Sequence, residues 1–74
     1  MDDQYSALVG KQIRSLRKQH RWTQEELSNR LQVAGCDLTR SALAKIEAGQ
    51  RHIYPDELKA LRMVLQVSYE MLLP

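Results

Sequence analysis

The chain has few residues that break helices or cross-link a fold. Its 74 residues include three glycines, two prolines, one cysteine and no phenylalanine. The lone Cys36 excludes an intramolecular disulfide. The longest apolar runs fall far short of the roughly 20 residues that a membrane-spanning helix needs. The first residues are acidic and lack the pattern of a secretion signal, so a cytoplasmic protein without membrane contact is expected.

The composition favours helices. Leucine, alanine, glutamine, glutamate, lysine and arginine are abundant, and all of them are good helix formers. A chain of this length is close to the size at which one hydrophobic core is marginal, so every helix must contribute to a shared core. We therefore expect one domain spanning residues 1–74, with an all-α fold.

Caps and apolar periodicity predict five short helices that form a compact bundle. The second has the clearest start, because Thr23 is a good N-cap and Glu26 completes a capping box. Trp22 and Leu27 suit the hydrophobic staple at the same start, which favours a structural role for Trp22 over base stacking. The expected helices run from about Ser6 to His20, from Thr23 to Ala34, from Thr39 to Gly49, from near Pro55 onward, and from Ser68 to about Leu73.

The connection between the second and third helices is unusually long. Seven residues separate Leu31 from Thr39, which suggests either an ordinary loop or a two-helix DNA-reading unit with an insertion. Gly35 is a natural left-handed helix stop and Thr39 is a good N-cap. These two signals assign residues 32–34 to a lengthened second helix and leave residues 35–38 as a short turn.

Two charged residues are predicted to face inward. At about 100° per residue, Arg17 lies about 40° from Ile13, and Glu47 lies about 40° from Leu43. A buried charge needs a partner, and the simplest solution is that Arg17 pairs with Glu47. The alternative is that one or both side chains extend to water.

Positive charge is concentrated near the start of the chain. Residues 4–24 contain no acid, and Lys11, Arg14, Lys18 and Arg21 fall in a sector about 80° wide on the first helix. Such a run is either a solvated face or an electrostatic footprint for a polyanion.

The outward face of the third helix is small and polar. Ser41, Ala44, Lys45 and Ala48 share this face, and Arg40 lies in the first turn. No large apolar side chain is present, so the helix can approach another surface closely.

No pattern in the sequence points to catalysis or to a cofactor. A nucleophile, a base and an orienting group do not converge, and no glycine-rich phosphate loop is present. His20 and His52 lack metal-ligand spacing. Cys36 is interpreted as a partly exposed turn residue, since neighbouring Asp37 disfavours a reactive thiolate. We expect no enzyme activity, no cofactor and no metal.

Three segments together resemble the lambda-repressor/Cro (XRE-type) helix-turn-helix family. They are "IRSLRKQHRWTQEELSNRL", "LTRSALAKIEAGQR" and "LKALRMVLQVSYEMLL". The resemblance covers roughly residues 10 to 73 and implies the lambda-repressor-like DNA-binding fold. The chain departs from the family at the turn between the second and third helices, which is about five residues longer.

The resemblance implies a role for individual residues. Arg17 and Glu47 match the family's structural ion pair. Base-facing positions correspond to Arg40, Ser41 and Lys45, while phosphate contacts correspond to Gln24, Thr39, Gln50, Arg51 and His52.

The function implied is a sequence-specific transcriptional regulator that binds double-stranded DNA. A homodimer on a pseudo-palindromic site is expected, because one protomer offers few base contacts. Its interface would use Met63, Tyr69, Met71 and Leu72, unless the last helix simply packs on its own core. The rival class is a protein-interaction module, such as an antitoxin or adaptor. Protein-binding surfaces usually present large anchors, which the third helix lacks.

Overall fold

The computed structural model describes residues 3–74, and within this range it contains five α-helices and no strand. The predicted all-α, five-helix fold is confirmed. Residues 1 and 2, the start of the expected domain 1–74, lie outside the described residues. The helices are α1 (Asp3–Gln19), α2 (Gln24–Val33), α3 (Arg40–Glu47), α4 (Pro55–Leu65) and α5 (Tyr69–Leu72).

The side-chain caps of α2 and α3 form as predicted. The Thr23 hydroxyl accepts a hydrogen bond from the backbone N–H of Glu26 at 3.1 Å, and the carboxylate of Glu26 accepts one from the Thr23 N–H at 3.5 Å. At α3, the Thr39 hydroxyl accepts from the Ala42 N–H at 3.1 Å. Each cap satisfies backbone donors that the first helical turn leaves unpaired.

α1 begins earlier than the sequence predicts. It starts at Asp3 instead of near Ser6, and it ends at Gln19. An acidic residue in the first turn is favoured by the helix dipole. The chain end also anchors this turn, since the Tyr5 hydroxyl donates to the carbonyl of Pro74 at 3.1 Å. The extra turn therefore rests on a contact between residues 69 positions apart, which local sequence patterns do not report.

One core joins all five helices. Its fully or nearly fully buried side chains come from every helix and from the two long connections. Burial of this apolar surface is the main force that holds helices of only 4 to 17 residues together. The buried apolar residues are Val9, Ile13, Leu16, Leu27, Leu31, Leu38, Leu43, Ile46, Ile53, Leu61, Leu65 and Leu72.

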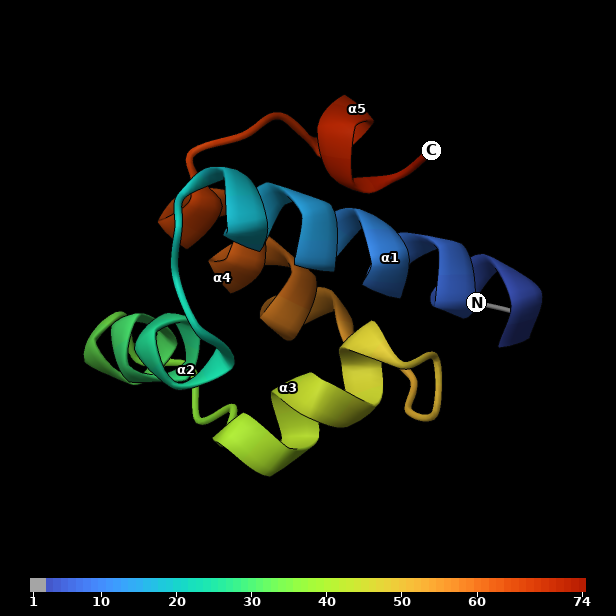
Figure 1. Cartoon of the computed structure of the whole chain (residues 1–74). Coiled ribbons are helices and arrows are strands. Elements are labelled where there is room, and N and C mark those ends of the chain that lie inside the picture. Colours follow the sequence, from blue (N-terminus) through green and yellow to red (C-terminus); the bar gives the residue numbers. More distant parts are fainter. Residues whose placement is uncertain (1–2) are drawn as a thin grey trace.

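The arrangement of the helices leaves α3 at the edge of the molecule. α1 contacts α3, α4 and α5, while α2 contacts α3 and α4. In Figure 1, α5 and α3 lie on opposite sides of α1. Only one side of α3 is therefore covered by other helices, and its other side faces outward.

α1 and α3 approach each other closely where glycine removes a side chain. A Cβ atom on Gly10 would fall on the carbonyl oxygen of Ile46. Just beyond α3, Gly49 lies against Ala7 of α1 with a backbone φ of +74°. The two glycines fix the end of α3 against the first half of α1.

Candidate nucleic-acid interface

One face of α3 is buried in the core, and the opposite face is therefore exposed. Leu43 and Ile46 are fully buried in the core. On the far side of the helix, Arg40, Ser41 and Lys45 are all exposed. The capped N-terminus at Thr39 fixes where the helix begins, so these three polar side chains project from a rigid element.

The apolar residues between these polar side chains are small. Ala44 is half-buried and Ala48 is exposed, and neither adds bulk to the outward face. A surface of this shape allows the helix backbone to come close to a groove. It also lacks the large side chains that usually anchor a partner protein.

α3 is held in place by a bidentate ion pair between Arg17 of α1 and Glu47. The Nε of Arg17 donates to Glu47 Oε2 at 2.8 Å, and a terminal nitrogen donates to Oε1 at 2.9 Å. The side chains are only 9% and 3% exposed, so solvent screens the pair weakly. The hydrogen bond to Glu47 raises the pKa of Arg17 above its ordinary value.

Two further bonds extend this pair into a network. The remaining terminal nitrogen of Arg17 donates to the carbonyl of Trp22 at 2.7 Å. The Gln24 side-chain amide donates to Glu47 Oε1 at 3.1 Å. The network thus joins the end of α3 to α1 and to the first turn of α2, and it satisfies most of the polar atoms that burial would otherwise strand.

Gln24 therefore has a structural partner that the sequence did not reveal. Its side chain is half-buried and one amide hydrogen is committed to Glu47. The backbone N–H groups of Gln24 and Glu25 lie in the first turn of α2, where a helix attracts anions.

Trp22 is held by stacking on both sides. Its ring stacks on His20 with centroids 4.2 Å apart, and the Arg30 guanidinium lies 4.2 Å from the ring centroid. The His20 ring nitrogen is in turn 2.7 Å from the carbonyl of Leu65. The half-buried indole thus connects α1, α2 and the end of α4.

The loop after α3 is tied to α4 by a second ion pair. Arg51 donates from its two terminal nitrogens to Glu57 at 2.8 and 2.9 Å, and to the carbonyl of His52 at 2.9 Å. Hydrogen bonding to Arg51 holds the pKa of Glu57 below its ordinary value, and the same bonds raise the pKa of Arg51. The Tyr54 N–H also donates to Glu57 at 3.0 Å, so one carboxylate organises the start of α4.

The three residues expected to contact phosphate after α3 are thus not equivalent. Gln50 and His52 are exposed, and a His52 ring nitrogen lies 3.5 Å from an Asp3 carboxylate oxygen. Arg51 is half-buried and already paired with Glu57. Sequence reasoning missed this partner, although an acid in the first turn of α4 six residues after Arg51 was a usable signal.

The long turn between α2 and α3 is ordered by its backbone. Gly35 has a φ of +90°, and the Cys36 N–H donates to the carbonyl of Leu31 at 2.8 Å. Leu38 is 1% exposed, and its carbonyl accepts a bond from the buried hydroxyl of Ser28 at 2.7 Å. Residues 32 and 33 extend α2 and Ala34 is its C-cap, so the turn proper is short, as predicted.

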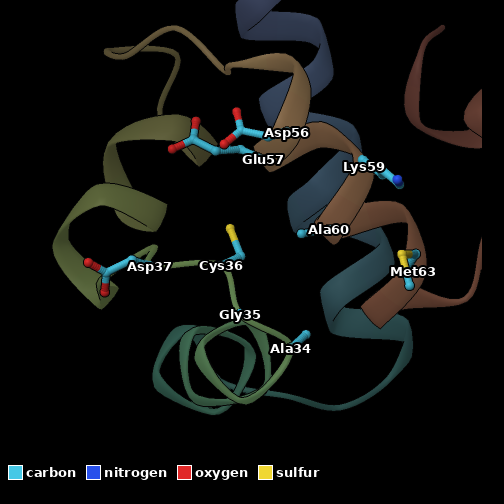
Figure 2. Close-up of a pocket in the computed structure, with 9 residues that line it drawn as sticks. All are labelled: Ala34, Gly35, Cys36, Asp37, Asp56, Glu57, Lys59, Ala60 and Met63. Atoms are coloured by element: carbon cyan, nitrogen blue, oxygen red, sulfur yellow. The ribbon is translucent and has the colours of Figure 1, made fainter.

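Cys36 lies beside a hollow of about 450 Å³ between this turn and α4. Figure 2 shows its sulfur pointing into the space below Asp56 and Glu57. Burial, followed by the negative charge of Glu57, raises the pKa of the Cys36 thiol. The neutral thiol is therefore favoured, in keeping with a turn residue and not with a reactive nucleophile.

The four residues expected at a dimer interface do not share one environment. Met63, Tyr69 and Met71 are 55%, 43% and 44% exposed. Leu72 is fully buried in the protein's own core, in line with the alternative that the last helix packs on that core. In a helix of four residues, an apolar sequence does not identify the inward side chain, and the structure places Leu72 there.

Other kinds of site receive no support within residues 3–74. No group of three or more histidine, cysteine or acidic side chains is placed to hold a metal ion. No helix in this range has the length and apolar character required to cross a membrane.

Comparison with known proteins connects this geometry to a family. No curated protein and no solved structure matches the chain. A family model described as helix-turn-helix matches residues 13–72, which include four complete helices and the C-terminal part of α1 from Ile13 to Gln19. The chain therefore belongs to the lambda-repressor/Cro-like (XRE-type) helix-turn-helix family of DNA-binding regulators.

Proposed function

We propose that the protein is a transcriptional regulator that recognises specific double-stranded DNA sequences, with α3 in the major groove. The observation that carries this proposal is the outward face of α3, where Arg40, Ser41 and Lys45 are exposed among small residues. B-form DNA admits an α-helix into its major groove, where each base pair presents a distinct pattern of donors and acceptors.

Arg40 and Lys45 carry most of the base recognition in this proposal. Arginine pairs bidentately with guanine O6 and N7, and lysine reaches the same acceptors. Ser41 both donates and accepts, so it discriminates little between bases. The two cations lie at opposite ends of α3, which lets them read different base pairs.

Phosphate contacts position this helix without reading sequence. The first turn of α2 at Gln24, the cap residue Thr39 and the exposed Gln50 and His52 supply donors around α3. The part of the Arg51 guanidinium that is not bonded to Glu57 is available for a phosphate contact. A protein with this function works in the cytoplasm of a bacterial cell, where its DNA lies.

A two-fold dimer on a pseudo-palindromic site completes the proposal. One α3 reads only a few base pairs, and two copies on half-sites one helical turn apart, about 34–36 Å, double the contacts. Met63, Tyr69 and Met71 are the exposed apolar side chains available to such a dimer near the C-terminus. The Arg62 guanidinium also lies over the Tyr69 ring, 5.1 Å from the ring centroid.

An antitoxin or adaptor is the second candidate, and one observation favours it. Val33, at the end of the lengthened α2, is 91% exposed, and it borders a hollow with the exposed Met63. This apolar surface lies on α2 and α4, away from the outward face of α3. A protein partner on that surface is compatible with DNA binding through α3.

Selection of duplexes from a random pool at low salt tests the proposed function. The protein is expected to enrich a pseudo-palindromic sequence and to bind it about 10³-fold or more tightly than unrelated DNA. Sedimentation of the complex should give two protomers per selected duplex. No enrichment and no low-salt binding to any duplex would refute the DNA-binding proposal.

A further inference from the structure

A stripe of unpaired cations runs along α1 and into the turn after it. Its members Lys11, Arg14, Lys18 and Arg21 are all exposed. No carboxylate among residues 3–74 lies within ion-pair distance of any of them. The two ion-paired arginines, Arg17 and Arg51, are instead each held by a glutamate.

The close contact between α1 and α3 locates this stripe on the molecule. Gly10 lies under the carbonyl of Ile46, and Arg17 reaches Glu47, so both residues face the end of α3. At about 100° per residue, Arg14 falls within about 60° of both Gly10 and Arg17 on the helix surface. Arg14 therefore lies directly beside the end of α3.

The other cations continue around the same flank. Lys18 and Lys11 lie about 40° and 60° beyond Arg14. Arg21 follows in the turn after α1, with a backbone φ of +61°. Ala7, on this flank, contacts Gly49 just after α3. The stripe thus borders α3 on the side of α1 that the other helices leave uncovered.

The remaining exposed side of α1 carries no charge. Gln12, Ser15 and Gln19 recur there with the half-exposed Leu8. The separation of charged and uncharged residues on one helix shows that the cations are not a uniform solvating coat.

We infer that this stripe binds the sugar–phosphate backbone of double-stranded DNA next to the bases read by α3. The inference rests on the proposed function and adds to it a surface outside α3 and its adjoining loop. Lys11 and Lys18 are about 10 Å apart along the helix axis at 1.5 Å per residue. Since each strand carries a phosphate about every 3.4 Å of duplex axis, the stripe spans more than one phosphate.

The chemistry of the stripe favours a polyanionic backbone over other partners. It contains four cations but no apolar or aromatic side chain that would enter a lipid layer or a protein groove. It is also continuous with α3, so one duplex reaches both surfaces. Contacts of this kind add affinity without sequence information and weaken with salt.

Salt dependence of binding to the selected duplex tests the stripe. Arg14→Gln and Lys18→Gln each remove one exposed charge, and Lys59→Gln on α4 removes one exposed charge elsewhere as the matched control. Each lost phosphate contact should reduce the slope of log K against log salt by about 0.9 per protomer. Specific and unrelated duplexes should weaken by the same factor in the stripe variants, and Lys59→Gln should leave both unchanged. Circular dichroism melting verifies that all three variants fold.

The outcomes separate this inference from the proposed function. If the wild-type protein selects a sequence but Arg14→Gln and Lys18→Gln have the same salt slope and affinity as Lys59→Gln, the stripe does not bind the backbone. The proposed function would then still stand. A wild-type protein that binds all duplexes equally but loses salt slope in the stripe variants would overturn sequence recognition and support the stripe. If Arg14→Gln or Lys18→Gln weakens binding to the selected duplex but not to unrelated duplexes, the substituted residue takes part in base recognition. That result would contradict the inference.

Discussion

Gly10 of α1 lies directly against the carbonyl oxygen of Ile46 in α3, and no side chain fits between them. This contact, next to the buried Arg17–Glu47 pair, sets how far α3 stands from the body of the protein. A change at Gly10 therefore moves or strains the helix that carries the proposed base-reading residues.

Gly10→Ala should destabilise the protein by about 2 kcal/mol. Alanine gains about 1 kcal/mol in helix propensity over glycine. Overpacking costs about 1–3 kcal/mol, and the upper end applies here because the added Cβ meets backbone, which no rotamer change relieves. Urea denaturation measures the difference. Ser15→Ala, an exposed change on the same helix, should be neutral or slightly stabilising. Equal stability of Gly10→Ala and wild type would show that α3 shifts without cost.

Gln66→Gly should stabilise the protein by about 0.5–1 kcal/mol. Gln66 caps α4 with φ +59° and ψ +49°, a left-handed conformation that costs a side-chain-bearing residue about 1–2 kcal/mol. The greater freedom of glycine in the unfolded chain cancels part of this gain. Thermal melting measures it, as a rise of a few degrees.

Gly35→Ala is the opposite change at an equivalent position. Its φ is +90°, and an added Cβ would meet no atom within 4 Å. The expected loss of about 1 kcal/mol is therefore purely conformational. A stabilising effect of Gly35→Ala would mean that the turn adopts a different backbone in solution.

Glu47→Gln should cost about 3–5 kcal/mol, because it leaves the buried Arg17 charge without its counterion. Replacing both residues together, as Arg17→Met with Glu47→Leu, should recover most of that loss, since apolar substitutes for a buried pair are often neutral. Chemical denaturation of the single and double variants gives the coupling free energy. Additive losses would show that the two charges do not interact.

The Arg51–Glu57 pair predicts a dependence of stability on pH. The folded state lowers the pKa of Glu57 below its ordinary value near 4.5, so the pair stabilises the fold above that pH and loses this effect as Glu57 is protonated at lower pH. Glu57→Gln should cost about 1.5 kcal/mol at pH 7, the lower end for charge-assisted bonds because Arg51 is partly exposed. Denaturation from pH 7 to pH 3 should show this difference narrowing below about pH 4.5. A difference that is constant over the whole range would contradict the pair.

Local rules identified the features of the fold that depend on one helix. Thr23 and Thr39 could be identified as caps because an N-cap side chain bonds to a backbone N–H only three residues further along the chain. The inward direction of Arg17 and Glu47 follows from helical periodicity alone, and the structure joins the two through facing helices.

Features that depend on irregular segments were not accessible in the same way. The partner of Arg51 is set by the path of residues 50–54, which no periodic rule predicts. The burial of Leu72 depends on how a four-residue helix docks, and the bond from Gln24 to Glu47 depends on the crossing of α2 and α3. The contacts of Leu72 and Gln24 are long-range, so sequence spacing carried no information about them. The six-residue spacing of Arg51 and Glu57 was a local signal, but it did not by itself identify the pair.

The central claim is that α3 reads bases through Arg40 and Lys45. Its most direct test is the affinity of wild type, Arg40→Ala and Lys45→Ala for the selected duplex and for every single-base variant of it. Each alanine variant should lose about 1–3 kcal/mol on the selected duplex and should lose discrimination at one base position of the half-site. If both variants bind all sequences more weakly by the same factor, Arg40 and Lys45 contact only the backbone and the claim is wrong.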